Sequence, residues 1–341
     1  MKTIEIKGSK GVSMILIGET LNNLKTYVST QNAFIITDSN VAGYYRRAFP
    51  PYKVIEIGLG EAVKTLETAQ DIYEKLLHLE ADRSSFIIGI GGGIVCDIAG
   101  FVASTYMRGV RFGFVSTTLL SQVDASVGGK NGVNFRGYKN IMGVLNQPEF
   151  VICDMNLLKT LPEREVLCGL AEIVKHGAIA NADLFSYIEE HDNEALTLHA
   201  DVIEKLVYDS VVIKTAVVNQ DEREDGERKK LNFGHTFGHA IEKVTGIPHG
   251  EAVSAGMVVA ARLSEKRGNI SPADTNRIET LLRKLKLPTE LPLNKAAVLD
   301  ALMKDKKRKG DLIDFVLLQG IGNAVLEEIP IRELEDVVRE W

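Results

Sequence analysis

The chain contains 341 residues, of which 45% are hydrophobic and 25% charged, and its formal net charge is −6. This length favours two domains, and the composition is typical of a globular protein with a full hydrophobic core. The negative charge argues against a nucleic-acid binder with a broad basic face. No apolar run in the sequence is long enough for a membrane span. The three cysteines have no CxxC spacing, which indicates the reducing cytoplasm.

The first part of the chain alternates short β-rich runs with helical stretches. Residues 1–7 alternate like a strand, and residues 62–79 have the periodicity of a helix. Further strands are predicted at residues 33–37, 53–57, 86–90, 112–116 and 150–153. This pattern is typical of a parallel sheet with crossover helices, so residues 1–155 are predicted to form an α/β, Rossmann-like domain.

A glycine-rich turn, Gly89-Ile90-Gly91-Gly92-Gly93, follows one predicted strand and leads into an apolar helix. Glycines at such a turn let backbone amides approach a pyrophosphate at the helix N-terminus, where the dipole favours anions. The motif is not a clean GxGxxG, because Ile94 takes the place of the last glycine. Packing is therefore the alternative role, and the turn alone leaves both open.

The densest polar run extends from Gln122 to Asn134 and continues at Lys139 and Asn140. One interpretation is a solvated loop. The other is a site for a small, multiply charged ligand, because an acid, lysines and amides alternate with glycines. Spacing alone does not separate the two.

Helical periodicity dominates from residue 163 to about residue 286, and only residues 315–318 and 324–327 read as strands. Residues 156–341 are therefore predicted to form a mainly helical domain. Within it, Glu172 and Lys175 lie three apart on one helical face. They form either a simple ion pair, worth roughly a few tenths of a kcal/mol, or part of a ligand site.

Three histidines, His235, His239 and His249, lie close together in the sequence and each adjoins a glycine. Neutral imidazole is the commonest protein ligand of zinc. His235 and His239 are four apart and share one face of a helix, while His249 lies in a turn that begins the next helix. The cluster indicates a metal or phosphate site, with ordinary structural histidines as the alternative.

Several strings together resemble the 3-dehydroquinate synthase family of the sugar phosphate cyclase superfamily. They are Gly91-Gly92-Gly93 through Asp97, Tyr106-Met107-Arg108-Gly109, Thr117-Thr118-Leu119-Leu120, residues 123–130, residues 169–175 and residues 228–239. Departures are Ser116, Asn131 and Phe135, which stand where the family usually has proline, threonine and histidine. None is expected to carry chemistry.

The resemblance implies a zinc ion, or cobalt in its place, held by Glu172, His235 and His249. It places His239 against the substrate phosphate instead of the metal. It also implies an NAD site built from Asp38, Glu61, Lys64, Gly92, Gly93, Asp97, Thr117, Thr118, Lys130, Lys139 and Thr160.

The resemblance further implies groups that hold the carboxylate, hydroxyls and phosphate of a sugar phosphate substrate. They are Lys130, Asn140, Lys214, Arg228, Asn232 and Lys306 or Lys307, with Asp124 and Lys175 as further catalytic candidates. Arg108 is expected to reach across the interface of a homodimer. No nucleic-acid or membrane partner is expected.

The implied reaction converts 3-deoxy-D-arabino-heptulosonate 7-phosphate to 3-dehydroquinate and phosphate. It runs through transient oxidation by NAD, phosphate elimination, re-reduction and an intramolecular aldol closure. The alternatives are another NAD- and zinc-dependent sugar phosphate cyclase, a metal-dependent alcohol dehydrogenase of similar fold, and a non-catalytic NAD-binding regulator.

Overall fold

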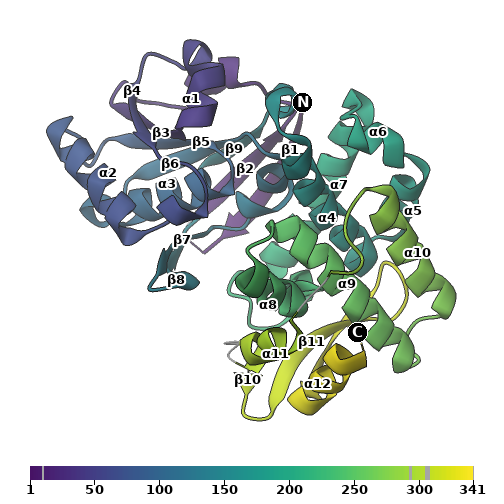
Figure 1. The fold of residues 1–341 in the computed structure, drawn as a ribbon. Helices are drawn as coiled ribbons and strands as arrows, with labels where there is room; N and C mark the ends of the chain where they lie inside the picture. Colours follow the sequence, from purple (N-terminus) through teal and green to yellow (C-terminus); the bar gives the residue numbers. More distant parts are fainter. Residues whose placement is uncertain (10, 292–293, 304–307, 341) are drawn as a thin grey trace. The chain divides into compact units, whose positions relative to one another are not determined.

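The computed structural model describes residues 1–9, 11–291, 294–303 and 308–340 (Figure 1). The chain forms two compact units. The first comprises Met1–Pro162 together with Lys214–Glu222, and the second comprises Glu163–Ile213 with the described residues from Arg223 onward. The domain boundary expected between residues 155 and 156 stays a prediction.

The first unit is built on a seven-stranded sheet with the order β1-β2-β9-β6-β5-β3-β4. Its strands are β1 (Lys2–Gly8), β2 (Gly11–Ile17), β3 (Ala33–Asp38), β4 (Lys53–Ile57), β5 (Phe86–Gly91), β6 (Arg111–Ser116) and β9 (Phe150–Cys153). Only the β1–β2 pair is antiparallel; the other neighbours are parallel. The predicted α/β class is confirmed, and β2 is a strand that the sequence pattern did not indicate.

Apolar side chains on both faces explain why the central strands read as continuous hydrophobic runs. Ile35, Ile88 and Ile152 belong to a buried core on one face, which α1 (Ser39–Tyr45) helps to cover through Val41. On the other face, α3 (Gly93–Thr105) packs against β5 and β6, beside α2 (Leu66–His78). A side chain at Gly89 would press against α3, since its Cβ would lie 3.0 Å from that of Ala99.

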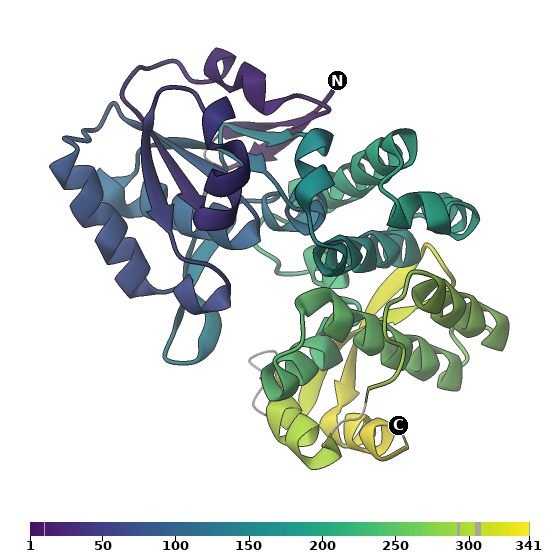
Figure 2. The same ribbon diagram turned by 45° about the horizontal axis from the view of Figure 1, so that its top comes forward.

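A two-stranded hairpin, β7 (Lys130–Phe135) and β8 (Tyr138–Leu145), projects from this unit (Figures 1 and 2). It contains the later part of the polar run, from Lys130 onward. The first part is largely buried: Gln122 and Val123 belong to a π-helical turn, η5 (Ser121–Ala125), and residues 126–129 are buried as well. The solvated-loop interpretation is therefore wrong for the buried residues of this run. The register of the hairpin is interrupted between Val133 and Phe135.

The second unit is mainly helical, as predicted. Its helices are α4 (Glu163–Ala180), α5 (Ala182–Glu190), α6 (Asp192–Leu196), α7 (Ala200–Gln220, whose end belongs to the first unit), α8 (His235–Thr245), α9 (His249–Lys266), α10 (Pro272–Lys284), α11 (Lys295–Met303) and α12 (Ile331–Glu340). None of the helices within the described ranges is long and apolar enough to cross a membrane.

Close backbone packing joins α9 to α4 and α8. A Cβ at Gly250 would lie 2.3 Å from the Cα of Cys168 on α4, and a Cβ at Gly256 would lie 2.0 Å from the carbonyl oxygen of Gly234, which precedes α8. Glycine is therefore required at both positions of α9. The three-stranded sheet of β10 (Arg308–Lys309), β11 (Leu312–Leu318) and β12 (Ala324–Pro330) completes the unit and contains both predicted strands.

Candidate active site

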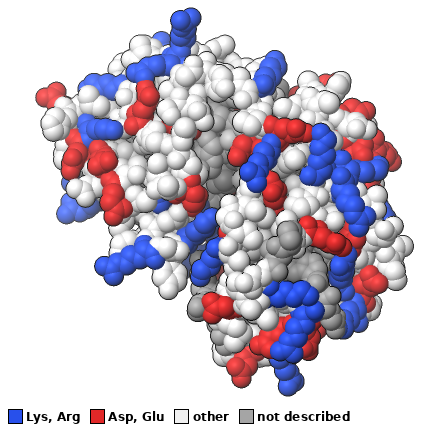
Figure 3. Space-filling model, in the orientation of Figure 1, with Lys and Arg blue, Asp and Glu red and all other residues white. Residues whose placement is uncertain are grey.

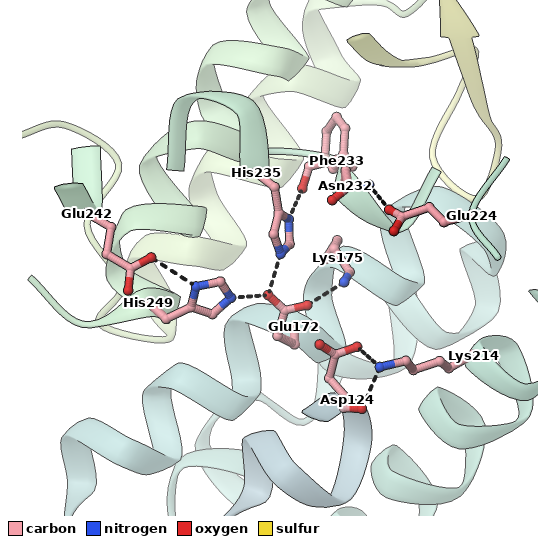
Figure 4. A network of polar contacts seen from close by, with 10 residues as sticks. All are labelled: Asp124, Glu172, Lys175, Lys214, Glu224, Asn232, Phe233, His235, Glu242 and His249. Atoms are coloured by element: carbon pink, nitrogen blue, oxygen red, sulfur yellow. Dashed lines mark hydrogen bonds and ion pairs between the residues drawn. The ribbon is translucent and has the colours of Figure 1, made fainter. Parts of the chain in front are cut away.

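The second unit brings together Glu172 from α4, His235 from the first residue of α8 and His249 from the first residue of α9 (Figure 4). One ligand atom from each lies within 4.8 Å of the other two. The two imidazole Nε2 atoms face the same carboxylate oxygen, Oε1 of Glu172, at 3.5 Å from His235 and 3.4 Å from His249. Three donors of this chemistry, converging from three helices, are suited to a divalent metal ion.

The other nitrogen of each ring is held by the protein. Nδ1 of His235 donates to the carbonyl oxygen of Phe233 at 3.1 Å, and Nδ1 of His249 lies 3.4 Å from Oε2 of Glu242. Both partners can only accept, so the proton of a neutral ring lies on Nδ1 and the Nε2 lone pair points into the cluster. Such partners orient metal-binding histidines and raise their basicity. The sequence reasoning missed Glu242, although it lies one helical turn beyond Gly238-His239.

The charge of Glu172 also fits a cation. Its side chain is fully buried, and Oε1 has no well-formed hydrogen bond among the described residues. Burial acts to raise its pKa, but Lys175, His235 and His249 outweigh burial and hold the pKa well below its usual range. Lys175, one turn along α4, forms a buried ion pair with Oε2. Glu172 is therefore an anion, and its Oε1 faces the Nε2 atoms of the two histidines.

His239 lies beside this cluster and is not part of it. Its ring centroid is 5.3 Å from that of His235, and its side chain is exposed. In the same unit, η7 (Glu227–Asn232) carries the buried Arg228, and Asn232 donates to Oε1 of Glu224 at 2.5 Å. Glu224 is a second residue that the sequence reasoning did not single out.

In the first unit, the NAD-site candidates follow the carboxyl ends of neighbouring parallel strands. Asp38 ends β3, Gly92 follows β5, and Thr117 follows β6. The connections leave β3 toward β4 on one side and β5 toward β6 on the other, so the topological switch point lies between β3 and β5. Open α/β sheets bind ligands in the crevice at this point.

The glycine-rich turn has a packing role. A Cβ at Gly92 would lie 2.9 Å from Cγ2 of Thr118, and a Cβ at Gly93 would lie 2.9 Å from Cβ of Ala125. The N-terminus of α3 has no side-chain cap among the described residues. The glycines thus allow tight packing and leave backbone amides at a helix end, which suits a pyrophosphate.

Four predicted residues of this unit form one polar chain with Asn134. Nζ of Lys64 contacts the carboxylate of Asp97 and donates to Oδ1 of Asn140 at 2.6 Å. Asn134 donates to Oε1 of Glu61 at 2.7 Å. Burial raises the pKa of Asp97, and the neighbouring Lys64 opposes that shift.

The remaining candidates are more dispersed. Nζ of Lys214 donates to Oδ1 and the carbonyl oxygen of Asp124, both at 2.5 Å (Figure 4). Lys130 and Lys139 are exposed on the hairpin, and the exposed Thr160 shares a 2.6 Å hydrogen bond with the hydroxyl of Tyr45. Arg108 is exposed and has a φ of 70°. Lys306 and Lys307 lie outside the described residues.

Solved structures with this architecture define its class. A 2-deoxy-scyllo-inosose synthase, solved with carbaglucose-6-phosphate, NAD+ and Co2+, is 27% identical with a TM-score of 0.89, covering 99% of this chain and 100% of its own. The 2-epi-5-epi-valiolone synthase of Streptomyces hygroscopicus, solved with NAD+ and Zn2+, is 25% identical with a TM-score of 0.87, covering 100% and 97%. Both are sugar phosphate cyclases.

Sequence comparison identifies the family within this class. The models for the N-terminal and C-terminal parts of 3-dehydroquinate synthase match residues 54–168 and 169–308. The 3-dehydroquinate synthase of Geobacter metallireducens is 45% identical over 85% of this chain and 81% of its own length, and that of Thermoanaerobacter pseudethanolicus is 43% identical over 93% and 92%. The chain belongs to the 3-dehydroquinate synthase family and is a phosphate-eliminating cyclase.

A sulfoacetaldehyde reductase of Bifidobacterium kashiwanohense, solved with NAD+, is 15% identical with a TM-score of 0.69 over 96% of both chains. This likeness shows that reductases share the fold.

Proposed function

We propose that the chain converts 3-deoxy-D-arabino-heptulosonate 7-phosphate to 3-dehydroquinate and phosphate, with NAD and a zinc or cobalt ion as cofactors. The observation that carries the proposal is the cluster of Glu172, His235 and His249, in which a buried carboxylate and two oriented imidazoles converge on one point. Three ligands leave positions open for substrate oxygens, which is typical of a catalytic metal site. The sugar phosphate cyclases solved with NAD+ and Co2+ or Zn2+ support this cofactor assignment.

When bound, NAD supplies reversible hydride transfer and the metal supplies Lewis-acid polarisation of substrate oxygens. The chain's own residues bind the substrate and orient it. Arg228 offers a rigid guanidinium fork to the substrate carboxylate, with Asn232 and Lys214 as hydrogen-bond donors. His239 and Lys130 bind the phosphate, and the pair of Asp124 with Lys214 holds the lysine ammonium in a fixed position.

The cofactor-binding residues belong to the first unit. Asp38, Glu61, Lys64, Asp97, Lys139 and Thr160 supply side chains to NAD, and Gly92, Gly93, Thr117 and Thr118 border its pyrophosphate at the start of α3. Lys175 belongs to the second unit, where its ion pair with Glu172 helps to keep that carboxylate ionised. We further propose a cytoplasmic homodimer in which Arg108 reaches the partner subunit.

One assay tests the proposed activity: phosphate release from the heptulosonate phosphate, measured with and without NAD and a chelator. We expect release that needs NAD and stops when the metal is removed, with recovery on adding zinc or cobalt. Release without either cofactor would rule the proposal out. A sugar phosphate that lacks the carboxylate serves as the control substrate and separates this activity from that of other cyclases.

A further inference from the structure

Asn134 lies between residues of the proposed NAD site and a residue of the proposed substrate site. We propose that Asn134 is a positioning residue that holds Glu61 and Asn140 in their binding positions and so links cofactor and substrate binding. The inference rests on the proposed function for its NAD site. Asn134 itself contacts neither NAD nor substrate in this proposal; it acts through its neighbours.

The two hydrogen bonds of the Asn134 side chain fix its orientation. Nδ2 donates to Oε1 of Glu61 at 2.7 Å, and Oδ1 accepts from the backbone N–H of Asn140 at 2.9 Å. A carboxylate can only accept and a backbone N–H can only donate, so the amide fits in one orientation. Asparagine supplies its donor and its acceptor from two separate atoms of one planar amide, which matches two partners that lie on different segments.

The backbone places Asn134 at this junction. The register of the β7–β8 hairpin shifts between Val133 and Phe135, where the single residue Asn134 of β7 lies opposite residues 139–141 of β8. Its N–H donates instead to the carbonyl oxygen of Lys64 at 2.8 Å, and it forms an isolated bridge with Thr65. These two contacts attach the hairpin to the segment that carries Glu61 and Lys64.

Side-chain contacts hold Asn140 in an uncommon backbone conformation, one that asparagine tolerates better than most residues. Its φ of 52° is in the left-handed region that side chains rarely adopt, and the residue is exposed. The bond from Asn134 satisfies its N–H, while its Oδ1 accepts from Nζ of Lys64 at 2.6 Å. Lys64 in turn pairs with Asp97. A continuous polar chain therefore runs from Glu61 through Asn134, Asn140 and Lys64 to Asp97.

Two substitutions at this position separate its two bonds. Asn134→Asp keeps the acceptor for the N–H of Asn140 but sets a negative charge against Glu61, whereas Asn134→Ala removes both bonds. The matched control is Asn146→Ala at the end of the same hairpin, where the lost bond is a 2.9 Å contact from Nδ2 to Oγ of Ser104. NAD affinity is measured by calorimetry, amide exchange of Asn140 by NMR, and kcat and KM by phosphate release.

We expect Asn134→Ala to weaken NAD binding by roughly 10- to 150-fold, which is the loss of one hydrogen bond to a charged group, and to speed exchange at Asn140. Asn134→Asp should weaken NAD binding similarly while keeping slow exchange at Asn140 and a near-normal substrate KM. Asn146→Ala should change neither. A general loss of hairpin stability would not produce this difference in Asn140 exchange between Asn134→Ala and Asn134→Asp.

Two results would overturn the inference: unchanged NAD affinity and Asn140 exchange in Asn134→Ala, or equal losses in the variants at positions 134 and 146 that follow their thermal stability. In both cases the wild type still binds NAD, so the proposed function stands. If the wild type and the control variant failed to bind NAD at all, the proposed function would fall, and the inference with it.

Discussion

Glu172 shows at the scale of single residues what spacing can and cannot predict. The motif reasoning placed Glu172 and Lys175 on one helical face, and the structure confirms their ion pair. The four-residue spacing of His235 and His239 indicated that these two act together, but the group of possible metal ligands that contains His235 includes Glu172 and His249 instead. Those partners come from different helices, so local periodicity carries no information about them. Family resemblance indicated this set, because it carries the tertiary arrangement with it.

The metal site makes a prediction for two histidines of one helix. His235→Ala should lose stoichiometric zinc and activity while the fold persists, because it removes one of the three proposed ligands. Changes to groups behind such ligands already cost roughly 10- to 100-fold in affinity, so loss of a ligand should cost more. The matched control is His239→Ala, which removes an exposed imidazole outside the ligand group. Metal content by mass spectrometry decides; full zinc in His235→Ala would refute the ligand assignment.

Arg228 makes a prediction about substrate choice. Its guanidinium is buried on η7, and lysine at this position would replace a two-pronged donor with a point charge. Arg228→Lys should therefore lower kcat/KM for the heptulosonate phosphate by roughly 1 to 3 kcal/mol in transition-state binding. Zinc and NAD affinities should stay unchanged. Lys230→Arg, a change in the ion pair with Glu227, is the control, and normal turnover by Arg228→Lys would argue for another cyclase substrate.

At the scale of elements, the sequence predicts best where burial is uniform. The apolar runs at residues 33–37, 53–57, 86–90, 112–116 and 150–153 all lie within strands of the sheet. The hairpin of β7 and β8 was missed because residues 135–143 are exposed throughout and show no alternation of polar and apolar faces. At the register shift of the hairpin, Asn134 contacts the distant segment around Lys64, and no local pattern contains such a contact.

The packing of α9 on its neighbours gives an element-scale prediction. In Gly256→Ala the new methyl group would meet backbone atoms of Gly234 and Gly238, so α8 must move. We expect a loss of roughly 1 to 3 kcal/mol in the free energy of unfolding, as for other overpacked sites, together with weaker metal binding because α8 begins at His235. Gly43→Ala on α1, with open space around the added atom, is the control and should be neutral or stabilising. Chemical denaturation measures both, and equal stability of the two variants would contradict the packing argument.

At the scale of the whole molecule, charge and composition set broad limits that say little about chemistry. On the face drawn in Figure 3, acidic and basic side chains are interspersed. Neither this distribution nor the net charge of −6 identifies a substrate. The fold alone does not identify the reaction either, because a reductase at 15% identity has the same architecture. The function depends on the residues at the ends of strands and helices. The motifs contain these residues, so their order along most of the chain indicated the family.

Cofactor turnover tests that functional conclusion on the intact enzyme. A cyclase returns the hydride to the intermediate within each cycle, so one equivalent of NAD per enzyme should support many rounds of phosphate release. Absorbance of NADH should show no lasting rise while phosphate accumulates. A dehydrogenase of the same fold would instead release NADH in proportion to product. Phosphate and NADH are measured in the same sample, with the chelated enzyme as the control. Steady NADH accumulation that matches product would replace the cyclase assignment with the dehydrogenase alternative.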